Sequence, residues 1–230
     1  MKRHYSIYKY LLFFICQIER YINKTRELFC TMLSQKFHKY FENPRLFNLV
    51  RGILDGGNTP KIKAILKQEG YKTILDVGCG TGAYIDMTDQ YYTGVDNSPS
   101  FIDYCKKNLE NEKRKFYLTD ATKMNFPDKS FDASVIINTI HHLTEEQTVH
   151  VLKDMARVSS KAVIILDAIP PKYDPISQFL YSRDRGAYFR TMHEQIQLAE
   201  KTGRLTAERY FQFKSTSRLY THSLIIFRPK

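Results

Sequence analysis

The segment ILDVGCGTG, residues 74–82, is the most informative part of this sequence. It is an apolar run that ends in the acidic residue Asp76 and Val77 and continues directly into a glycine-rich turn. This order is typical of the first strand, turn and helix of a doubly wound nucleotide-binding fold, in which glycines let a ligand approach the backbone. The spacing Gly-x-Gly-x-Gly is one residue tighter than in nicotinamide-dependent dehydrogenases, and no Gly-Lys-Ser/Thr follows as in a phosphate-binding loop. The segment therefore argues against both of those classes of site.

Short apolar runs alternate with helical segments along the rest of the chain. The expected strands are residues 72–77, 91–95, 115–119, 133–137 and 162–166, and the expected helices are 45–54, 61–68, 82–89, 98–111 and 144–158. Strands that are apolar nearly throughout indicate a parallel sheet with helices on both faces. Two last strands, 210–213 and 219–227, are joined by a polar turn and predict an antiparallel hairpin at the sheet edge. The predicted fold class is α/β, a Rossmann-like doubly wound, mostly parallel sheet with an antiparallel C-terminal hairpin and N-terminal helices.

Polar residues stand at the ends of four of the predicted parallel strands. Asp96 ends the second strand 20 residues after Asp76, and Asp120 follows the third. Asn138 follows the fourth strand and precedes a pair of histidines. The carboxyl ends of parallel strands meet at one edge of the sheet, where ligands of such folds bind, and a carboxylate at the second strand can take both hydroxyls of a ribose. The sequence therefore predicts a single ligand site at this edge.

Four motifs, in the expected order and spacing, resemble those of class I S-adenosylmethionine-dependent methyltransferases of the small-molecule type. The motifs are LDVGCGTG (75–82), GVDNSP (94–99), DATKMNFPDKSFD (120–132) and INTIHHL (137–143). The resemblance implies that S-adenosyl-L-methionine is the cofactor. The cofactor-binding residues that it implies are Asp76, Gly78, Cys79, Gly80 and Gly82 at the methionine end, Asp96 at the ribose, Asn97, Asp120 and Ala121 near the adenine, and Asn138 beneath the sulfonium.

One motif of that family is missing. The family usually has a Lys-Pro-Gly-Gly turn after the Arg-Val that ends the fourth helix. Here Arg157 and Val158 are followed by Ser159-Ser160-Lys161, without proline or glycine. The conformation of this connection is therefore left open by the resemblance, although it lies far from the expected cofactor site.

The C-terminal part of the chain supplies candidates for catalysis and for substrate binding. Methyl transfer from a sulfonium is an in-line displacement, and a hydroxyl or carbon acceptor also needs a base, most often histidine. His141 and His222 are the catalytic candidates, and the adjacent His142 is the alternative. The substrate candidates are Arg183, Arg190 and Tyr220, from short motifs that are similar to those of bacterial small-molecule methyltransferases. Arginines in the loop after the fifth strand can clamp a carboxylate or phosphate, and the alternative is that they pair with surface neighbours.

The distribution of charge along the sequence indicates which class of acceptor the catalytic part can bind. The formal net charge of the 230 residues is +11, but residues 1–73 carry 14 Lys and Arg against 5 Asp and Glu, and residues 74–230 carry 21 against 19. The catalytic part is thus near neutral, which disfavours nucleic acid as its partner. The Asn-Pro-Pro-Tyr-like turn of enzymes that methylate exocyclic amines is also absent at residues 138–140. We expect methyl transfer to a small-molecule acceptor such as a sugar or metabolite hydroxyl. A lipid or quinone methyltransferase at a membrane surface and an RNA methyltransferase are the alternatives.

The N-terminal region is expected to be a basic amphipathic helical extension over residues 1–43, followed by the methyltransferase domain over 44–230. The apolar run 10–16 is shorter than the roughly 20 residues of a membrane-spanning helix, and no small-x-small cleavage site follows it. The expected location is cytoplasmic, with peripheral membrane contact through residues 1–41 as one hypothesis. Packing of this region on the domain, and translation that begins at Met32, are the other two. The four cysteines form no CxxC pair, so we expect no metal site and no disulfide.

Overall fold

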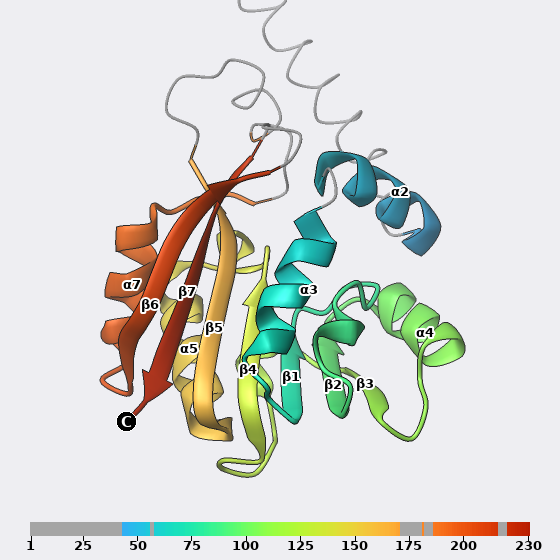
Figure 1. Cartoon of the computed structure of the whole chain (residues 1–230), viewed down its shortest axis with the longest axis horizontal. Coiled ribbons are helices and arrows are strands. Elements are labelled where there is room, and N and C mark those ends of the chain that lie inside the picture. The colour runs from blue at the N-terminus through green and yellow to red at the C-terminus, as the bar shows by residue number, and fades with distance from the viewer. Residues whose placement is uncertain (1–42, 56–57, 171–180, 182–185, 216–219) are drawn as a thin grey trace, which may run out of the picture.

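The computed structural model describes residues 43–55, 58–170, 181, 186–215 and 220–230. Its centre is a seven-stranded sheet with the strand order β3-β2-β1-β4-β5-β7-β6 (Figure 1). The strands are β1 (Thr73–Val77), β2 (Tyr91–Asp96), β3 (Arg114–Leu118), β4 (Phe131–Ile137), β5 (Ser159–Ile169), β6 (Leu205–Lys214) and β7 (Thr221–Pro229). The first five are parallel, and β7 runs antiparallel to both β5 and β6. The predicted doubly wound sheet with a C-terminal hairpin at its edge is confirmed.

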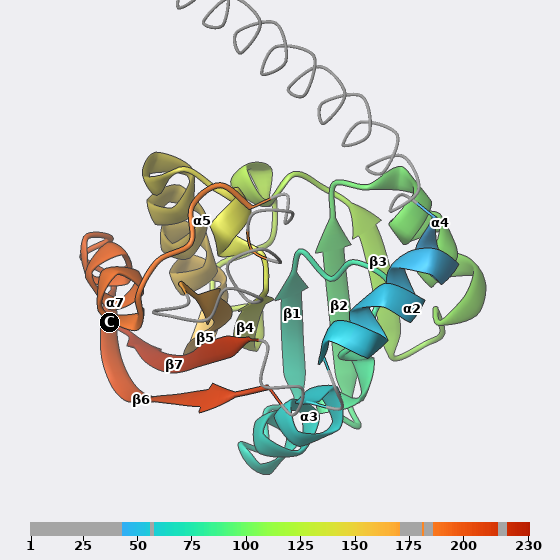
Figure 2. The ribbon, with the colours of Figure 1, turned by 90° about the horizontal axis from the view of Figure 1, so that it is seen from above.

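Helices cover both faces of the sheet. On one face lie α3 (Asn58–Gln68) and α4 (Pro99–Asn108), and on the other lie α5 (Glu145–Val158) and α7 (Met192–Glu200) (Figure 2). The helix α2 (Pro44–Asp55) packs against α4, where Phe47 contacts Phe101. Three short 3₁₀ turns, η1 (Ile85–Met87), η2 (Ala121–Lys123) and η3 (Ile140–His142), follow β1, β3 and β4. The order of the sheet reverses between β1 and β4, and that point at the carboxyl edge is where ligands of doubly wound folds bind.

The core consists of two apolar layers, because successive residues of a buried strand point to opposite faces. Ile74 of β1 belongs to the layer that also contains Ile62 of α3 and Ile102 of α4. Its neighbour Leu75 belongs to the layer that contains Leu152 of α5 and residues of α7. The sheet is therefore held rigidly from both sides, and the loops at its carboxyl edge are built on this fixed frame.

Several predicted elements differ from the observed ones. The expected helix over 82–89 is wrong: only η1 forms there, because Gly82 has a φ of +73° and Thr88 is already extended, so too few residues remain for an α-helix. The helix α7 was not predicted, although Thr191 and Glu194 form a capping box, which is a sequence pattern typical of a helix N-terminus. β5 and β6 also run longer than expected, since β4 pairs with the start of β5, and β7 pairs with the end of β5 and with β6.

The missing turn after the fourth helix of the family has a simple structural consequence. α5 ends at Val158, and Ser159 adopts φ −99° and ψ 136°, so the chain enters β5 with no turn between them. The hydroxyl of Ser159 is buried and lies 2.8 Å from that of Ser134 on β4. The hydrogen bond between these two hydroxyls satisfies both of them inside the core.

Some predictions fall on residues outside the described ranges. These are the helical extension, of which only Asn43 is described, and the substrate candidate Arg183. Among the helices that the structure describes, none combines the length and the apolar character that a bilayer span requires.

Candidate cofactor and acceptor site

The glycine loop after β1 shows why its residues are glycines. Gly78 and Gly80 have φ angles of +76° and +53°, a region that side chains rarely occupy. A Cβ on Gly78 would stand 2.6 Å from Oγ1 of Thr139, so this position is closed by packing against the loop after β4. A Cβ on Gly80 would meet nothing nearer than Phe47 at 3.8 Å. Gly80 therefore presents uncovered backbone, where a ligand can approach.

Asp96 at the end of β2 holds this loop in place. Its carboxylate accepts a hydrogen bond from the backbone N–H of Gly80 at 2.8 Å and another from that of Ser98 at 2.9 Å. Burial raises the pKa of Asp96, and the backbone N–H donors act in the opposite direction. The carboxylate thus links the loop to β2 and stands beside the uncovered backbone of Gly80.

A second carboxylate, Asp76 of β1, lies under the same loop and is 1% exposed. The hydroxyl of Tyr92 donates to its Oδ2 at 2.6 Å, whereas Oδ1 has no hydrogen-bond partner among the described residues. Burial raises the pKa of Asp76 to about 7; the hydrogen bond from Tyr92 lowers it, and the nearby charge of Asp96 raises it further. Two carboxylates around one glycine loop, one with an unsatisfied buried oxygen, suit a ligand that carries positive charge.

The other predicted cofactor residues line the same edge. Asp120 follows β3 and caps η2. Its carboxylate accepts hydrogen bonds from the N–H and the hydroxyl of Thr122, and these bonds lower the pKa of the carboxyl. Asn138 follows β4 with a φ of +49° and donates its N–H to the carbonyl of Leu166. Asn97 is exposed, Ala121 is half-buried at the start of η2, and the thiol of Cys79 is buried. The structure brings all ten predicted positions to one edge, and their contacts with a cofactor stay predictions.

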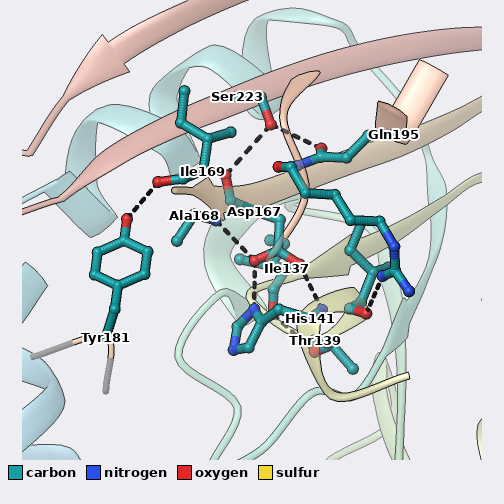
Figure 3. A network of polar contacts seen from close by, with 11 residues as sticks. Ile137, Thr139, His141, Asp167, Ala168, Ile169, Tyr181, Gln195 and Ser223 are labelled. Atoms are coloured by element: carbon teal, nitrogen blue, oxygen red, sulfur yellow. Dashed lines mark hydrogen bonds and ion pairs between the residues drawn. The ribbon is translucent and has the colours of Figure 1, made fainter. Parts of the chain in front are cut away.

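Next to this edge, the predicted residue His141 of η3 is held by a carboxylate that sequence reasoning missed. Nδ1 of His141 lies 2.5 Å from Oδ1 of Asp167, and its backbone N–H donates to Oδ2 at 3.1 Å (Figure 3). Asp167 also accepts the N–H of Ala168 at 2.7 Å, and its carbonyl lies 3.3 Å from the hydroxyl of Ser223. The available signal was an acid at the end of β5, the same pattern that identified Asp76.

Arg190 supports the same turn from outside. It is 7% exposed, and its guanidinium donates to the carbonyls of Ile140 at 2.9 Å and Leu143 at 2.8 Å. Its own carbonyl accepts from the side chain of Gln195 on α7 at 3.0 Å. Burial lowers the pKa of Arg190. Two of its N–H groups are thus engaged by the fold itself, and we place Arg190 among the groups that position η3.

A row of aromatic rings in contact continues from η3 toward β6, and we call it the aromatic row. It consists of His142, His141, Phe189, Tyr181, Tyr220, His222 and Phe213, with neighbouring ring centroids 4.2–6.2 Å apart. The two predicted histidines therefore lie at different positions in it. His141 is next to the turn that contacts the glycine loop, whereas His222 stands on β7 opposite Ala168, with three rings between them. Tyr220, a predicted substrate residue, is half-buried in the middle of the row.

Comparison with known proteins agrees with this site. Residues 74–161 match the family model of a methyltransferase domain. Over 104 residues the chain is 33% identical to a probable tRNA methyltransferase 9B of Mus musculus, and the match covers 43% of this chain and 22% of that protein. Over 75 residues it is 35% identical to a fatty-acid O-methyltransferase of Mycolicibacterium smegmatis, with coverages of 30% and 27%. The chain thus matches only about a quarter of the length of these relatives.

A solved structure shows the same fold. The magnesium protoporphyrin IX methyltransferase of Synechocystis, crystallised with S-adenosylhomocysteine, superposes with a TM-score of 0.61 at 14% identity, over 75% of this chain and 82% of that one. The fold is therefore the Rossmann-like fold of class I methyltransferases. Residues 74–161 of this chain match a methyltransferase domain, and the chain shares its fold with a methyltransferase crystallised with S-adenosylhomocysteine.

Proposed function

We propose that this protein transfers the methyl group of S-adenosylmethionine to a small-molecule acceptor at the carboxyl edge of the sheet. The observation that supports the cofactor end is the uncovered backbone of Gly80 between the carboxylates of Asp76 and Asp96. Asp76 would bind the ammonium group of the methionine part, and Asp96 would bind the ribose. Asn97, Asp120 and Ala121 would surround the adenine, with Asn138 near the sulfonium, and the remaining loop residues would contact the cofactor through their backbone.

The acceptor end favours a small molecule, because it is built from the aromatic row and the buried turn η3. Aromatic rings offer a surface on which a small molecule can stack, whereas a nucleic acid needs a broad basic surface for its phosphates. Phe189 stacks on His141 at 4.7 Å with an interplanar angle of 12°. We therefore place the acceptor beside η3, where a hydroxyl can come close to His141.

His141 is the proposed general base. S-adenosylmethionine supplies the electrophilic methyl group when it is bound. The chain's own contribution is to align the acceptor and to take its proton, because the Asp167 carboxylate fixes Nδ1 and directs Nε2 away from itself (Figure 3). A carboxylate in this position also stabilises the imidazolium that forms when His141 receives the proton. His222 of β7 is the second candidate.

Binding of S-adenosylhomocysteine provides the first test. A ligand at about 100 times its Kd adds about 2.7 kcal/mol of stability, which corresponds to a Tm increase of about 5–10 °C for a chain of this size. Gly80→Ala places a Cβ in the uncovered space and is expected to remove most of this increase. Gly70→Ala is the matched control, because Gly70 has a φ of +71° and nothing within 4 Å of its Cβ position. Differential scanning fluorimetry measures both. A wild-type Tm that does not respond to the ligand would contradict the proposed function.

The acceptor class is tested by transfer of a labelled methyl group from S-adenosylmethionine into three separate fractions: water-soluble small molecules, lipids and tRNA. We expect label in the small-molecule fraction. In His141→Gln, loss of the base should reduce the rate of methyl transfer by about a hundredfold. In His222→Gln the rate of methyl transfer should change little. Label in tRNA is the second candidate outcome, because the relatives of tRNA methyltransferase type are 33% identical. Label confined to tRNA or to lipids would overturn the small-molecule acceptor, and near wild-type rates in both variants would exclude either histidine as the base.

A further inference from the structure

Tyr92 and Asp76 form a polar pair inside an otherwise apolar layer of the core. Tyr92 of β2 is 1% exposed, and its ring packs against Phe116 of β3 with the centroids 5.7 Å apart. A phenylalanine would fill the same space, so packing alone does not account for a hydroxyl here. A buried phenol is normally bound to a polar partner. In this protein the partner is the Asp76 carboxylate, at 2.6 Å.

Among the described residues, no positively charged side chain interacts with Asp76. The groups that interact with it are the Tyr92 hydroxyl and the Asp96 carboxylate from β2 and the Cys79 thiol from the glycine loop. The Cys105 thiol of α4 interacts with Tyr92 and Cys79. None of the ion pairs within the described residues includes Asp76. A buried carboxylate without a cation is expensive, so a cationic partner has to come from the ligand.

The two oxygens of Asp76 therefore have different roles. Tyr92 binds Oδ2, while Oδ1 is the buried acceptor with no partner in the described structure. A carboxylate that is fixed through one oxygen cannot rotate freely, and its second oxygen is held in one direction. That oxygen lies under the loop with the uncovered backbone of Gly80, where the cofactor is proposed to bind.

We propose that Tyr92 is a positioning residue: its hydroxyl holds one oxygen of Asp76 so that the other is presented to the ammonium group of the cofactor's methionine part. This inference rests on the proposed function. It assigns to a core tyrosine of β2 a role in cofactor affinity that acts through Asp76, without contact between Tyr92 and the cofactor.

The affinity for the cofactor should depend on pH through the ionisation of Asp76. Burial raises the pKa of Asp76 to about 7, and the hydrogen bond from Tyr92 lowers it. Only the ionised carboxylate pairs with an ammonium group, so affinity for the cofactor should increase as the pH rises toward 7 and level off above it. Removal of the Tyr92 hydroxyl removes the lowering effect, so the midpoint of this increase should move to higher pH.

Isothermal titration calorimetry with two ligands tests the proposal. S-adenosylhomocysteine carries the amino-acid part, and 5′-methylthioadenosine has the same nucleoside and thioether without it. In Tyr92→Phe at pH 7 we expect the Kd of S-adenosylhomocysteine to rise about tenfold, and that of 5′-methylthioadenosine to change by less than about twofold. A general structural defect would weaken both ligands alike, so equal losses, or no loss for either ligand, would overturn the proposal.

Two further measurements separate Tyr92 from other causes. In the Asp76→Asn background, Tyr92→Phe should not change the Kd of S-adenosylhomocysteine any further, because Tyr92 acts only through the Asp76 carboxylate. Tyr71→Phe is the control for loss of a core hydroxyl, since Tyr71 is half-buried and interacts with Glu69 and Arg209 instead. An additive double variant, or a Tyr71→Phe effect as large as that of Tyr92→Phe, would contradict the inference.

A third measurement does not depend on the folding of Tyr92→Phe. Incorporation of 3-fluorotyrosine in place of Tyr92 keeps the ring and makes the hydroxyl a stronger donor, so the pH midpoint of S-adenosylhomocysteine binding should move to lower pH. An unmoved midpoint would overturn the role of Tyr92. If S-adenosylhomocysteine does not bind the wild-type protein at any pH, the proposed function fails; if it binds and the Tyr92 variants behave as wild type, only this inference fails.

Discussion

Asp96→Ala is expected to weaken the binding of S-adenosylhomocysteine by about a hundredfold. The carboxylate accepts the backbone N–H groups of Gly80 and Ser98, so its loss releases the glycine loop from β2. The variant also removes the acceptor proposed for the ribose hydroxyls. A hydrogen bond to a charged group is worth about 1.5–3 kcal/mol, and two or more such bonds account for a change of this size. Calorimetric titration of the purified variant measures the Kd.

Asp132→Ala is the matched control for this result. Asp132 also accepts a backbone N–H, that of Lys72 at 2.8 Å, and forms an ion pair with Lys161 at 3.0 Å. It stands near the start of β4, at the opposite end of the strands, so its loss should leave the Kd within about twofold. Unchanged affinity in Asp96→Ala, or an equal loss in both variants, would remove Asp96 from the cofactor site.

Asp167→Ala is expected to lower the free energy of unfolding by about 3–5 kcal/mol, because removal of one partner of a buried pair leaves the other unsatisfied. The carboxylate of Asp167 is 1% exposed and satisfies both N–H groups of His141 and that of Ala168. For a chain of this length the loss corresponds to a Tm decrease of roughly 6–20 °C. Asp167→Asn, which keeps one acceptor oxygen, should cost less. Urea denaturation followed by circular dichroism gives both values.

The control for Asp167→Ala is Asp128→Ala, which removes an ion pair at the surface. Asp128 bonds to Arg157 at 2.8 Å, but its side chain is 73% exposed. Asp128→Ala should therefore change the unfolding free energy by less than about 1 kcal/mol. A loss in Asp167→Ala that is no larger than this would show that the contact with His141 does not organise η3.

Much of this architecture was predictable, because it follows from short-range patterns. The strands were recognised by runs of four to nine residues that are mostly apolar, and the ligand edge by the polar residues Asp76, Asp96 and Asn138 at their ends. The boundaries were less predictable. β5 and β6 are longer than their predicted runs, since neighbouring strands hold their outer residues. β4 pairs with the start of β5, and β7 pairs with the end of β5 and with β6.

The same distinction applies to the site. The residues around the cofactor could be identified from the segment 74–82 and from the spacing of the acids that follow it, because glycine positions and strand ends are local properties. The partners of these residues were not visible in the sequence. Tyr92 is 16 positions from Asp76, and His141 is 26 positions from Asp167. Neither separation has a characteristic pattern, because each contact forms only when neighbouring strands are packed in register, and burial then makes the hydrogen bond between them strong.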